Sequence, residues 1–370
     1  MKVAIVCDWL TNIGGAEKLL FEIHKMFPDA PIYTSKYNKK GIDWFNDTDV
    51  RTGWLQIFPT KLRRFLSPLR SHYFKHLDLS SYDLVISVTG AEAKGVKTQN
   101  KKGEKAVHLC YCHVPTQYYW AMYDEYVKNP GFGILNPLVR FFFKLFVKPM
   151  RKADYKAAQR PDHFITISDY AKDEIKKYYH RDATVINPPV EIEDFGIDGK
   201  VKAKIDDTFI TTSRQVTWKR LDLCIEGCLK TNSKLIIIGE GPEHKNLVKL
   251  AKNSPLIEFR PLLKKAELAS YLRGAKGYIF PSMEPFGIAP VEALAAGCPV
   301  IAFDQGGARD YIIENKNGIF FKKQDGEAVA RAIKKFNEMS FDKKAVSKSV
   351  EKFSRERFRK ELQQLVEKNA

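Results

Sequence analysis

The chain has 370 residues, of which 44% are hydrophobic and 28% are charged, and this composition excludes a disordered protein. A chain of this length accommodates two domains of ~150 residues, each with a well-buried core. The net charge is +17, from 61 Lys and Arg against 44 Asp and Glu, and it favours an anionic partner such as nucleic acid, anionic lipid or a phosphorylated substrate.

We expect neither a signal peptide nor a membrane-spanning helix. The apolar run that follows Met1 is short, and the run at 138–147 is interrupted by Arg140 and Lys144, well below the ~20 residues that a spanning helix needs. The six cysteines lie in apolar segments and lack the spacing of zinc ligands. This pattern favours reduced thiols in a cytosolic protein over a metal site or disulfides.

Strands and helices alternate along the first half of the chain. Buried strands are expected at 3–7, 84–88, 106–112, 163–167 and 184–186, and helices at 16–26 and from Ser168 or Asp169 onward. The last of these strands runs into Asn187, Pro188 and Pro189. Two consecutive prolines end regular structure, so we place a domain boundary there.

The second half repeats this alternation. Strands are expected at 209–212, 234–238, 257–259, 277–280 and 300–303, and helices at 219–229, 247–252, 291–296 and 343–368. Repeated strand–helix alternation predicts parallel sheets with helices on both faces. The fold class is therefore α/β, with two doubly wound domains that bind ligands at the carboxyl ends of their strands, in the cleft between them.

Two features of the first half are candidates for ligand contact. Gly14 and Gly15 precede a helix, where backbone N–H groups can approach a phosphate or a sugar, although a plain tight turn explains them equally well. His113 lies just past a strand and before a proline. A structural histidine is the alternative interpretation of this residue.

The segment 282–292 carries two acidic residues in a strand–loop–helix context. Glu284 lies in the loop, Glu292 lies in the first turns of the helix, and seven residues separate them. A carboxylate can accept both hydroxyls of a ribose, and N–H groups at the start of a helix can hold phosphate. A capping acid and a surface acid are the alternative.

This segment resembles the signature of the retaining GT-B glycosyltransferases of family 4. The resemblance runs from Glu284 to Glu292, with Pro285, Phe286 and Gly287 between them, and continues to residue 300. Beyond this signature, the resemblance to the family covers essentially the whole chain. The other matching segments are 14–15, 187–190, 239–242 and 306–307, and the segments 111–120, 151–154 and 160–162 are similar to bacterial O-antigen and exopolysaccharide mannosyltransferases.

The resemblance implies roles for particular residues. Arg214 and Lys219 would stabilise the leaving nucleoside diphosphate without a metal, whereas without the resemblance each is a solvated surface cation. Glu284 would face the transferred sugar, and His113 would line the donor-sugar pocket; these four residues are the catalytic candidates. The implied nucleotide- and substrate-binding residues are Gly14, Gly15, Glu292, Phe286, Gly287, Ile288 and Leu263. No metal site and no cofactor beyond the nucleotide-sugar co-substrate are expected.

Two departures from the family pattern limit these roles. Pro261 stands where the family commonly has glycine, so the pocket expected for the nucleobase around Leu263 departs from the family pattern. Arg309 and Asp310 stand where the motif after Gly306 and Gly307 often has Pro-Glu.

The implied enzyme is a retaining, metal-independent hexosyltransferase. It would move mannose from GDP-mannose to a saccharide or a polyprenyl-diphosphate-linked glycan, in cell-surface polysaccharide synthesis. Residues 1–190 would form the acceptor-binding Rossmann-like domain, 191–345 the nucleotide-sugar-binding one, and 346–370 a C-terminal helix that packs back on the N-terminal domain.

Several alternatives remain at this stage. A UDP-sugar-using hexosyltransferase, or an epimerase or phosphorylase, could share the GT-B fold. A basic nucleic-acid-binding protein is the alternative of another class, although no recognised binding module is present. Cations and apolar residues are mixed in the segments 61–66, 70–75 and 140–152. This mixture favours a cytoplasmic protein that is peripherally attached to the anionic inner face of the cell membrane. Ordinary amphipathic helices packed on the domain are the alternative.

Overall fold

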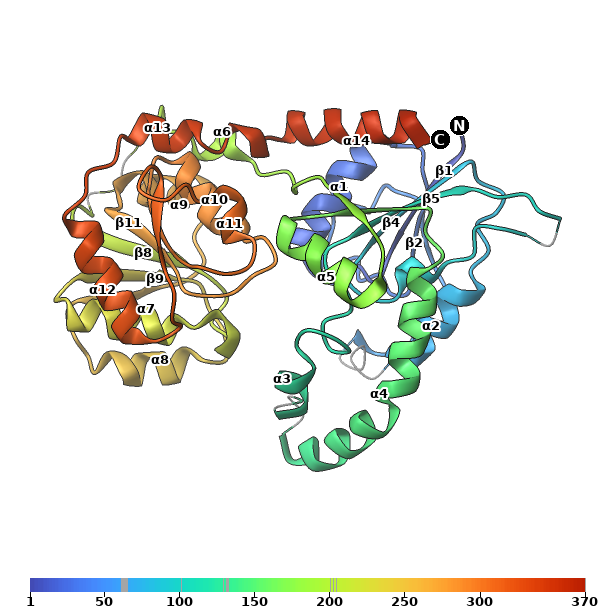
Figure 1. The fold of residues 1–370 in the computed structure, drawn as a ribbon, viewed down its shortest axis with the longest axis horizontal. Coiled ribbons are helices and arrows are strands. Elements are labelled where there is room, and N and C mark those ends of the chain that lie inside the picture. The colour runs from blue at the N-terminus through green and yellow to red at the C-terminus, as the bar shows by residue number, and fades with distance from the viewer. Residues whose placement is uncertain are drawn as a thin grey trace. The chain divides into compact units, whose positions relative to one another are not determined.

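The computed structural model describes residues 1–60, 66–100, 102–128, 130, 133–199, 201, 203 and 205–369. These residues fall into two compact units, each built around its own sheet. Unit 1 is Met1–Pro188 together with the residues from Phe358 onward, and unit 2 is Pro189–Arg357. Figure 1 shows the elements of each unit.

The sheet of unit 1 is entirely parallel, with the order β3-β2-β1-β4-β5-β6-β7 among the described strands. The strands are β1 (Val3–Cys7), β2 (Ile32–Thr34), β3 (Val50–Thr52), β4 (Leu84–Thr89), β5 (Val107–Cys112), β6 (His163–Thr166) and β7 (Ala183–Val185). The two central strands, β1 and β4, are almost completely buried because helices cover both faces.

The helices of unit 1 follow the strands in turn. The α-helices are α1 (Gly15–Met26), α2 (Ser67–His76), α3 (Tyr123–Lys128), α4 (Asn136–Ala158) and α5 (Asp169–Tyr179), and the 3₁₀ turns are η1 (Trp54–Ile57), η3 (Ala93–Gly95) and η4 (Gly133–Leu135). The Ser168 side chain caps α5 by accepting the N–H of Ala171 at 3.0 Å, as the sequence predicts.

Unit 2 has a parallel sheet with the order β10-β9-β8-β11-β12-β13 among its described strands. The strands are β8 (Thr208–Thr212), β9 (Lys234–Ile238), β10 (Ile257–Arg260), β11 (Gly277–Phe280), β12 (Val300–Phe303) and β13 (Gly318–Phe321). In both sheets the strand order reverses beside the first strand, β1 or β8. Ligands of doubly wound sheets bind at such a reversal, at the carboxyl ends of the strands.

The helices of unit 2 bury their apolar faces against this sheet, with Leu223, Ile225, Val329 and Ile333 in its main core cluster. The α-helices are α6 (Ile192–Phe195), α7 (Leu221–Lys230), α8 (His244–Ala251), α9 (Lys265–Gly274), α10 (Ile288–Ala295), α11 (Ala308–Tyr311), α12 (Gly326–Asn337) and α13 (Lys343–Lys348), and the 3₁₀ turns are η5 (Thr217–Lys219) and η6 (Glu351–Phe353).

The expected continuous helix at 343–368 is wrong. The segment forms α13, η6 and then α14 (Arg355–Asn369). Phe353 is fully buried and meets the Phe286 ring edge to face in unit 2, whereas Phe358 is fully buried in unit 1 and lies beside the Tyr111 ring. The helical path is interrupted at Ser354, which has an extended backbone with ψ of 156°, and the Ser354 hydroxyl accepts the N–H of Arg357 at 3.3 Å.

The expected return of the C-terminal helix to the N-terminal domain is confirmed. Phe358, Leu362 and Val366 are buried along one face of α14, and Arg359 forms an ion pair with Glu22 of α1. The acceptor- and donor-binding roles expected for 1–190 and 191–345 stay predictions. None of the described helices is both long enough and apolar enough to cross a membrane.

The helix expected at 219–229 is also corrected. Lys219 closes the 3₁₀ turn η5, and α7 begins only at Leu221. Arg220 between them has a left-handed conformation with φ of 52°, which interrupts the helical path. Lys219 therefore belongs to a turn at the carboxyl end of the sheet rather than to a helix.

Candidate active site

The loop that carries Glu284 connects β11 to α10, and buried aromatic side chains fix its position. Phe286 is buried between the rings of Tyr311 and Phe353, at 5.6 Å from each, and Tyr311 donates its hydroxyl to the Phe286 carbonyl at 3.0 Å. Gly287 has φ of 90°, and a Cβ there would lie 2.8 Å from the Phe280 ring. Only glycine fits, so the sequence fixes where this loop turns into α10.

Glu284 and Lys219 form an ion pair at the top of this loop. The Lys219 Nζ lies 2.5 Å from Glu284 Oε1, and their side chains are only 14% and 18% exposed. Ser282 donates its hydroxyl to the same carboxylate oxygen at 2.9 Å, and the Lys219 ammonium stands 4.2 Å from the centre of the Trp218 ring. Two catalytic candidates from separate segments therefore meet at the carboxyl ends of adjacent strands, β8 and β11.

The two glycines after β12 pack against the backbone of this loop. A Cβ on Gly306, which has φ of 69°, would overlap the Glu284 carbonyl, and one on Gly307 would overlap Phe286. The N–H of Gly307 donates to the Glu284 carbonyl at 2.8 Å. In the structure Gly306 and Gly307 thus support the Glu284 backbone. Arg309, one of the departures from the family pattern, turns back to Asp304 at 2.9 Å.

Arg214 lies on an exposed turn after β8, and a neighbouring loop fixes that turn. A Cβ on Gly239, which has φ of 122°, would overlap the Ser213 carbonyl, and one on Gly241 would overlap that of Gln215. Gln215 is fully buried; its amide donates to the Gly239 carbonyl at 2.5 Å, and its Oε1 lies 2.8 Å from His244 Nδ1. Sequence reasoning missed Gln215, a buried amide that joins the two loops.

The remaining candidates of unit 2 lie at the same edge of the sheet. Ile288 and Glu292 are four residues apart in α10, so they share one face of that helix, and both are partly exposed. Leu263 is partly exposed in the loop after β10. Because all strands of this sheet are parallel, these residues, Arg214, Lys219 and Glu284 lie toward a single edge.

The candidates of unit 1 lie at the carboxyl edge of the other sheet. Gly14 and Gly15 begin α1 directly after the β1 loop. His113 follows β5, donates its N–H to the Thr89 carbonyl at 2.9 Å, and has a buried Nε2 without a hydrogen-bond partner among the described residues. Burial lowers the pKa of His113 to about 4, so its imidazole is neutral near pH 7.

Asp8 is a residue of this edge whose role the sequence did not reveal. It directly follows β1, is buried, and accepts hydrogen bonds from the Thr89 hydroxyl at 2.9 Å and from the N–H groups of Gly90, Ala91 and Ala93 at 2.8–3.1 Å. Burial and the nearby Glu92 carboxylate raise its pKa. Asp8 fixes the turn after β4 that lies beside His113. A carboxylate directly after a buried strand was the available signal.

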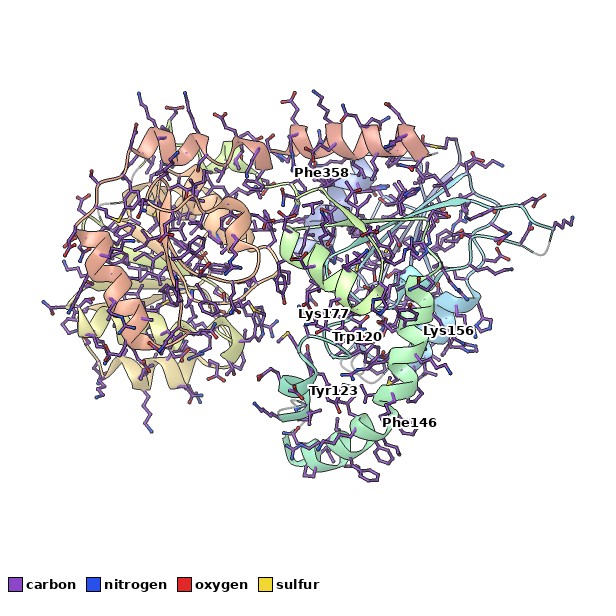
Figure 2. The ribbon with its side chains drawn as sticks, in the orientation of Figure 1. Trp120, Tyr123, Phe146, Lys156, Lys177 and Phe358 are labelled. Carbon is purple, nitrogen blue, oxygen red and sulfur yellow. The ribbon has the colours of Figure 1, made fainter. Side chains whose placement is uncertain are left out.

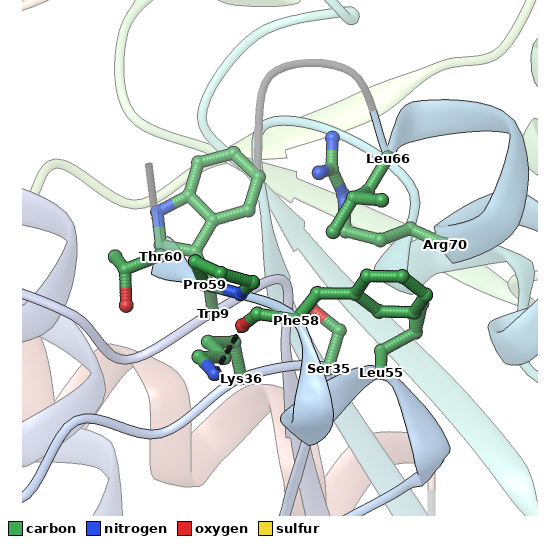
Figure 3. Close-up of a pocket in the computed structure, with 9 residues that line it drawn as sticks. All are labelled: Trp9, Ser35, Lys36, Leu55, Phe58, Pro59, Thr60, Leu66 and Arg70. Atoms are coloured by element: carbon green, nitrogen blue, oxygen red, sulfur yellow. Dashed lines mark hydrogen bonds between the residues drawn. The ribbon is translucent and has the colours of Figure 1, made fainter. Parts of the chain in front are cut away.

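Figure 3 shows a small pocket whose lining includes Trp9, the residue that follows Asp8. Arg70 stands over the Trp9 ring at 4.9 Å and forms an ion pair with the buried Glu92 at 2.9 Å. The pocket is lined by Trp9, Ser35, Lys36, Leu55, Phe58, Pro59, Thr60, Leu66 and Arg70.

Among the described residues, no group of three or more His, Cys, Asp or Glu side chains is arranged to hold a metal ion. All six cysteines are buried and none forms a disulfide.

Residues 197–356 match the model of a family described as Glycosyl transferases group 1. This segment lies within unit 2 and contains Arg214, Lys219, Glu284 and Glu292. Among curated proteins, the chain is 30% identical over 168 residues to an uncharacterized glycosyltransferase, YqgM, of Bacillus subtilis, which covers 43% of this chain and 46% of that protein. It is 28% identical over 209 residues to the alpha-1,3/1,6-mannosyltransferase ALG2 of Mus musculus, covering 47% and 50%. The chain thus spans about half the length of the curated relatives it matches.

Solved structures match over the whole chain. Alr3699/HepE of Anabaena, determined in complex with UDP, has a TM-score of 0.73 at 18% identity, with 100% of both chains covered. The apo form of the lipopolysaccharide outer core galactosyltransferase WaaB has a TM-score of 0.71 at 17% identity, with 99% of both chains covered. At this identity the likeness establishes the fold, so the GT-B architecture predicted from the sequence is confirmed.

Proposed function

We propose that this chain, whose residues 197–356 match the model of the family described as Glycosyl transferases group 1, transfers a hexose from a nucleotide sugar to a glycan acceptor. The Lys219–Glu284 ion pair is the observation that carries the proposal. An ammonium group and a carboxylate, both largely shielded from water, lie where a doubly wound sheet binds its ligand. This pair suits a donor that has an anionic diphosphate and a sugar rich in hydroxyl groups.

The ion pair suggests how the donor is engaged. The diphosphate would draw the Lys219 ammonium away from Glu284, and Arg214, on its exposed turn, would supply a second cation. Glu284, freed from its partner, would accept hydrogen bonds from the sugar hydroxyls. Glu292, with Ile288 on the same face of α10, would hold the ribose, and Leu263 would lie beside the base.

In the proposed reaction the acceptor hydroxyl attacks the anomeric carbon from the side on which the diphosphate leaves. The bond between the anomeric carbon and the phosphate oxygen breaks, the bond to the acceptor oxygen forms, and the acceptor's proton passes to the leaving phosphate. The configuration at the anomeric carbon is retained. Fixed cations aimed at the developing charge would supply the largest stabilisation. His113, neutral because of its burial, would act as a hydrogen-bonding group for the sugar and not as a charge.

We propose GDP-mannose as the donor. The mannosyltransferase-like segments around His113 and Asp154, together with the likeness to the mannosyltransferase ALG2, support this choice. A UDP-sugar is the competing donor, because the structural relative HepE is known in complex with UDP and with UDP-glucose. The acceptor would be a saccharide or a polyprenyl-diphosphate-linked glycan, met at the cytoplasmic face of the cell membrane.

Slow donor hydrolysis tests the proposal without knowledge of the acceptor. The protein is incubated with GDP-mannose, UDP-glucose, UDP-galactose and ADP-glucose, and release of the nucleoside diphosphate is followed by chromatography. We expect GDP release from GDP-mannose and its loss in Lys219→Ala. Duplex DNA should not compete. Faster hydrolysis of a UDP-sugar would show that the donor is a UDP-sugar and not GDP-mannose. If calorimetry shows that none of these nucleotide sugars binds, the assignment as a glycosyltransferase is refuted.

A further inference from the structure

Helix α4 of unit 1 turns its apolar stripe toward solvent. Of its 23 residues, only Val147, Asp154 and Ala158 are buried. The stripe consists of Leu138, Phe141, Phe142, Leu145 and Phe146, whose exposures are 56%, 63%, 47%, 58% and 50%. Their spacing of three and four residues places them on one face of the helix. This is the pattern of a core-facing stripe, yet no described part of the chain buries it.

The opposite face of α4 contacts the rest of unit 1. Arg140 donates to the carbonyls of Val127 and Lys128 at 2.8 and 2.9 Å, and the Phe143 ring lies 5.5 Å from Tyr123. Arg151 donates to the Tyr119 carbonyl at 2.5 Å. Residues 140, 143, 147 and 151 form a line on the side of the helix away from the stripe. The orientation of α4 is therefore fixed by contacts, and the exposure of the stripe is a consequence of that orientation.

The second half of α4 anchors the helix in the core of unit 1. Asp154 pairs with the buried Lys94 at 2.6 Å and accepts hydrogen bonds from Thr116 at 2.9 Å and from Trp120 and Tyr179, each at 2.7 Å. Pro149 lies inside the helix, and Figure 1 shows α4 changing direction along its length, so that its first half extends away from the sheet. Figure 2 places Phe146 on this extended part.

The charged side chains of the first part of α4 have a single sign. Residues 136–153 contain five cations, Arg140, Lys144, Lys148, Arg151 and Lys152, and no Asp or Glu. Lys144, Lys148 and Lys152 are exposed and border the stripe on one side. Two copies of this face would bring the cations together, which disfavours a second copy of the chain as its partner.

We propose that the first half of α4, the stripe with its bordering lysines, docks on an anionic phospholipid surface. The phenylalanine rings would enter the headgroup region, and the lysines would lie against the anionic headgroups. This inference deepens the proposed membrane association and rests on it, but not on the proposed chemistry, because vesicle binding is measured without turnover. Lys61, Arg63 and Arg64, the other basic segment expected to bind lipid, lie outside the described residues.

Cosedimentation of the full chain with vesicles tests this surface. Phosphatidylcholine vesicles are compared with vesicles that also contain phosphatidylglycerol, at low and at high salt. We expect binding that depends on the anionic lipid and that weakens, without vanishing, at high salt. Lys144→Glu with Lys148→Glu should weaken binding at low salt by about 30-fold or more, from ~1 kcal/mol for each cation near the surface.

Matched variants separate docking from general loss of charge or apolar surface. Lys344→Glu with Lys348→Glu changes two exposed lysines at the same spacing on α13 of unit 2 and should leave binding unchanged. Phe141→Ser with Phe142→Ser should abolish the salt-resistant part of binding, whereas Val248→Ser with Ile313→Ser, exposed residues of unit 2, should not. Thermal unfolding by circular dichroism checks that each variant is folded.

Three outcomes would overturn the inference. The first is equal binding to neutral and anionic vesicles at low salt. The second is binding at high salt by the folded phenylalanine variant that equals the binding of the native protein. The third is a dimer, seen by sedimentation equilibrium, that dissociates in the phenylalanine variant while vesicle binding is absent, which would make a second copy of the chain the occupant of the stripe.

Discussion

Replacing Glu284 by glutamine should tighten the binding of a nucleoside diphosphate and lower sugar transfer. The Lys219 ammonium lies 2.5 Å from Glu284 Oε1, so a diphosphate that binds Lys219 must compete with this carboxylate. Glutamine preserves the size of the side chain and one acceptor oxygen but removes the charge. The diphosphate then meets a lysine that is already available and no longer meets a negative neighbour.

The size of the effect follows from the geometry of the pair. A hydrogen bond to a charged group contributes about 1.5–3 kcal/mol. The side chains of Lys219 and Glu284 are 14% and 18% exposed, so solvent screens part of their attraction. We expect Glu284→Gln to strengthen binding of the nucleoside diphosphate by about 1–2 kcal/mol, which corresponds to a dissociation constant about 5–30-fold lower.

Titration calorimetry with GDP and with UDP measures this change. A matched control is Glu327→Gln, an exposed glutamate of α12 in the same unit that is paired with Lys230, and it should leave nucleotide binding unchanged. In a Lys219→Ala background, the gain from Glu284→Gln should largely disappear, because the competition is for that lysine. Weaker nucleotide binding in Glu284→Gln than in the native protein would refute the reasoning.

Three further predictions concern single side chains. Arg214→Ala and Lys219→Ala should each lower the turnover number by ~100-fold or more, as loss of one preorganised donor to a transition state does, and EDTA should have little effect; loss of activity in EDTA that Mn²⁺ restores would contradict the metal-independent mechanism. Glu292→Gln should weaken nucleotide binding by ~1.5–3 kcal/mol in calorimetry and leave the turnover number of the bound donor nearly unchanged; an equal loss in turnover would contradict a ribose contact. His113 has a pKa lowered from 6.5 to about 4, so the unfolded chain binds its proton first as the pH falls. The free energy of unfolding should therefore decline between these two pH values, and His113→Asn should make that decline shallower in denaturant titrations; an unchanged slope would show that the imidazole is not shielded.

The sequence predicted the strands of both sheets better than the contacts between loops. Buried parallel strands are continuous apolar runs, as at 3–7 and 234–238, and these are visible without a structure. The short strands β2, β3 and β13 were not predicted. The pairing of Lys219 with Glu284 depends on β8 and β11 being neighbours in the sheet, and strand order is not written in the local sequence.

Helix α4 illustrates a second limit of sequence reasoning. An amphipathic helix is predicted by the spacing of Leu138, Phe141, Phe142 and Leu145. This spacing is the same whether the apolar face of the helix packs against a core or faces solvent. The deciding residues, Arg140, Phe143 and Arg151, lie on the other face, and their partners are distant in the chain. Gln215 and Asp8 were missed for the same reason, because each acts through backbone groups that only the fold brings within reach.

The return of α14 to unit 1 has a consequence for how the protein is made. Phe358, Leu362 and Val366 fill the core of the unit whose strands are synthesised first, so that unit cannot complete its packing until the ribosome has released residues made more than 150 positions later. Until then the face of the nascent unit that receives these three side chains is exposed apolar surface, which is the kind of surface that chaperones bind. The same connectivity means that a fragment cut after Pro188 lacks part of its own core, and an exchange of units between related chains needs two junctions rather than one.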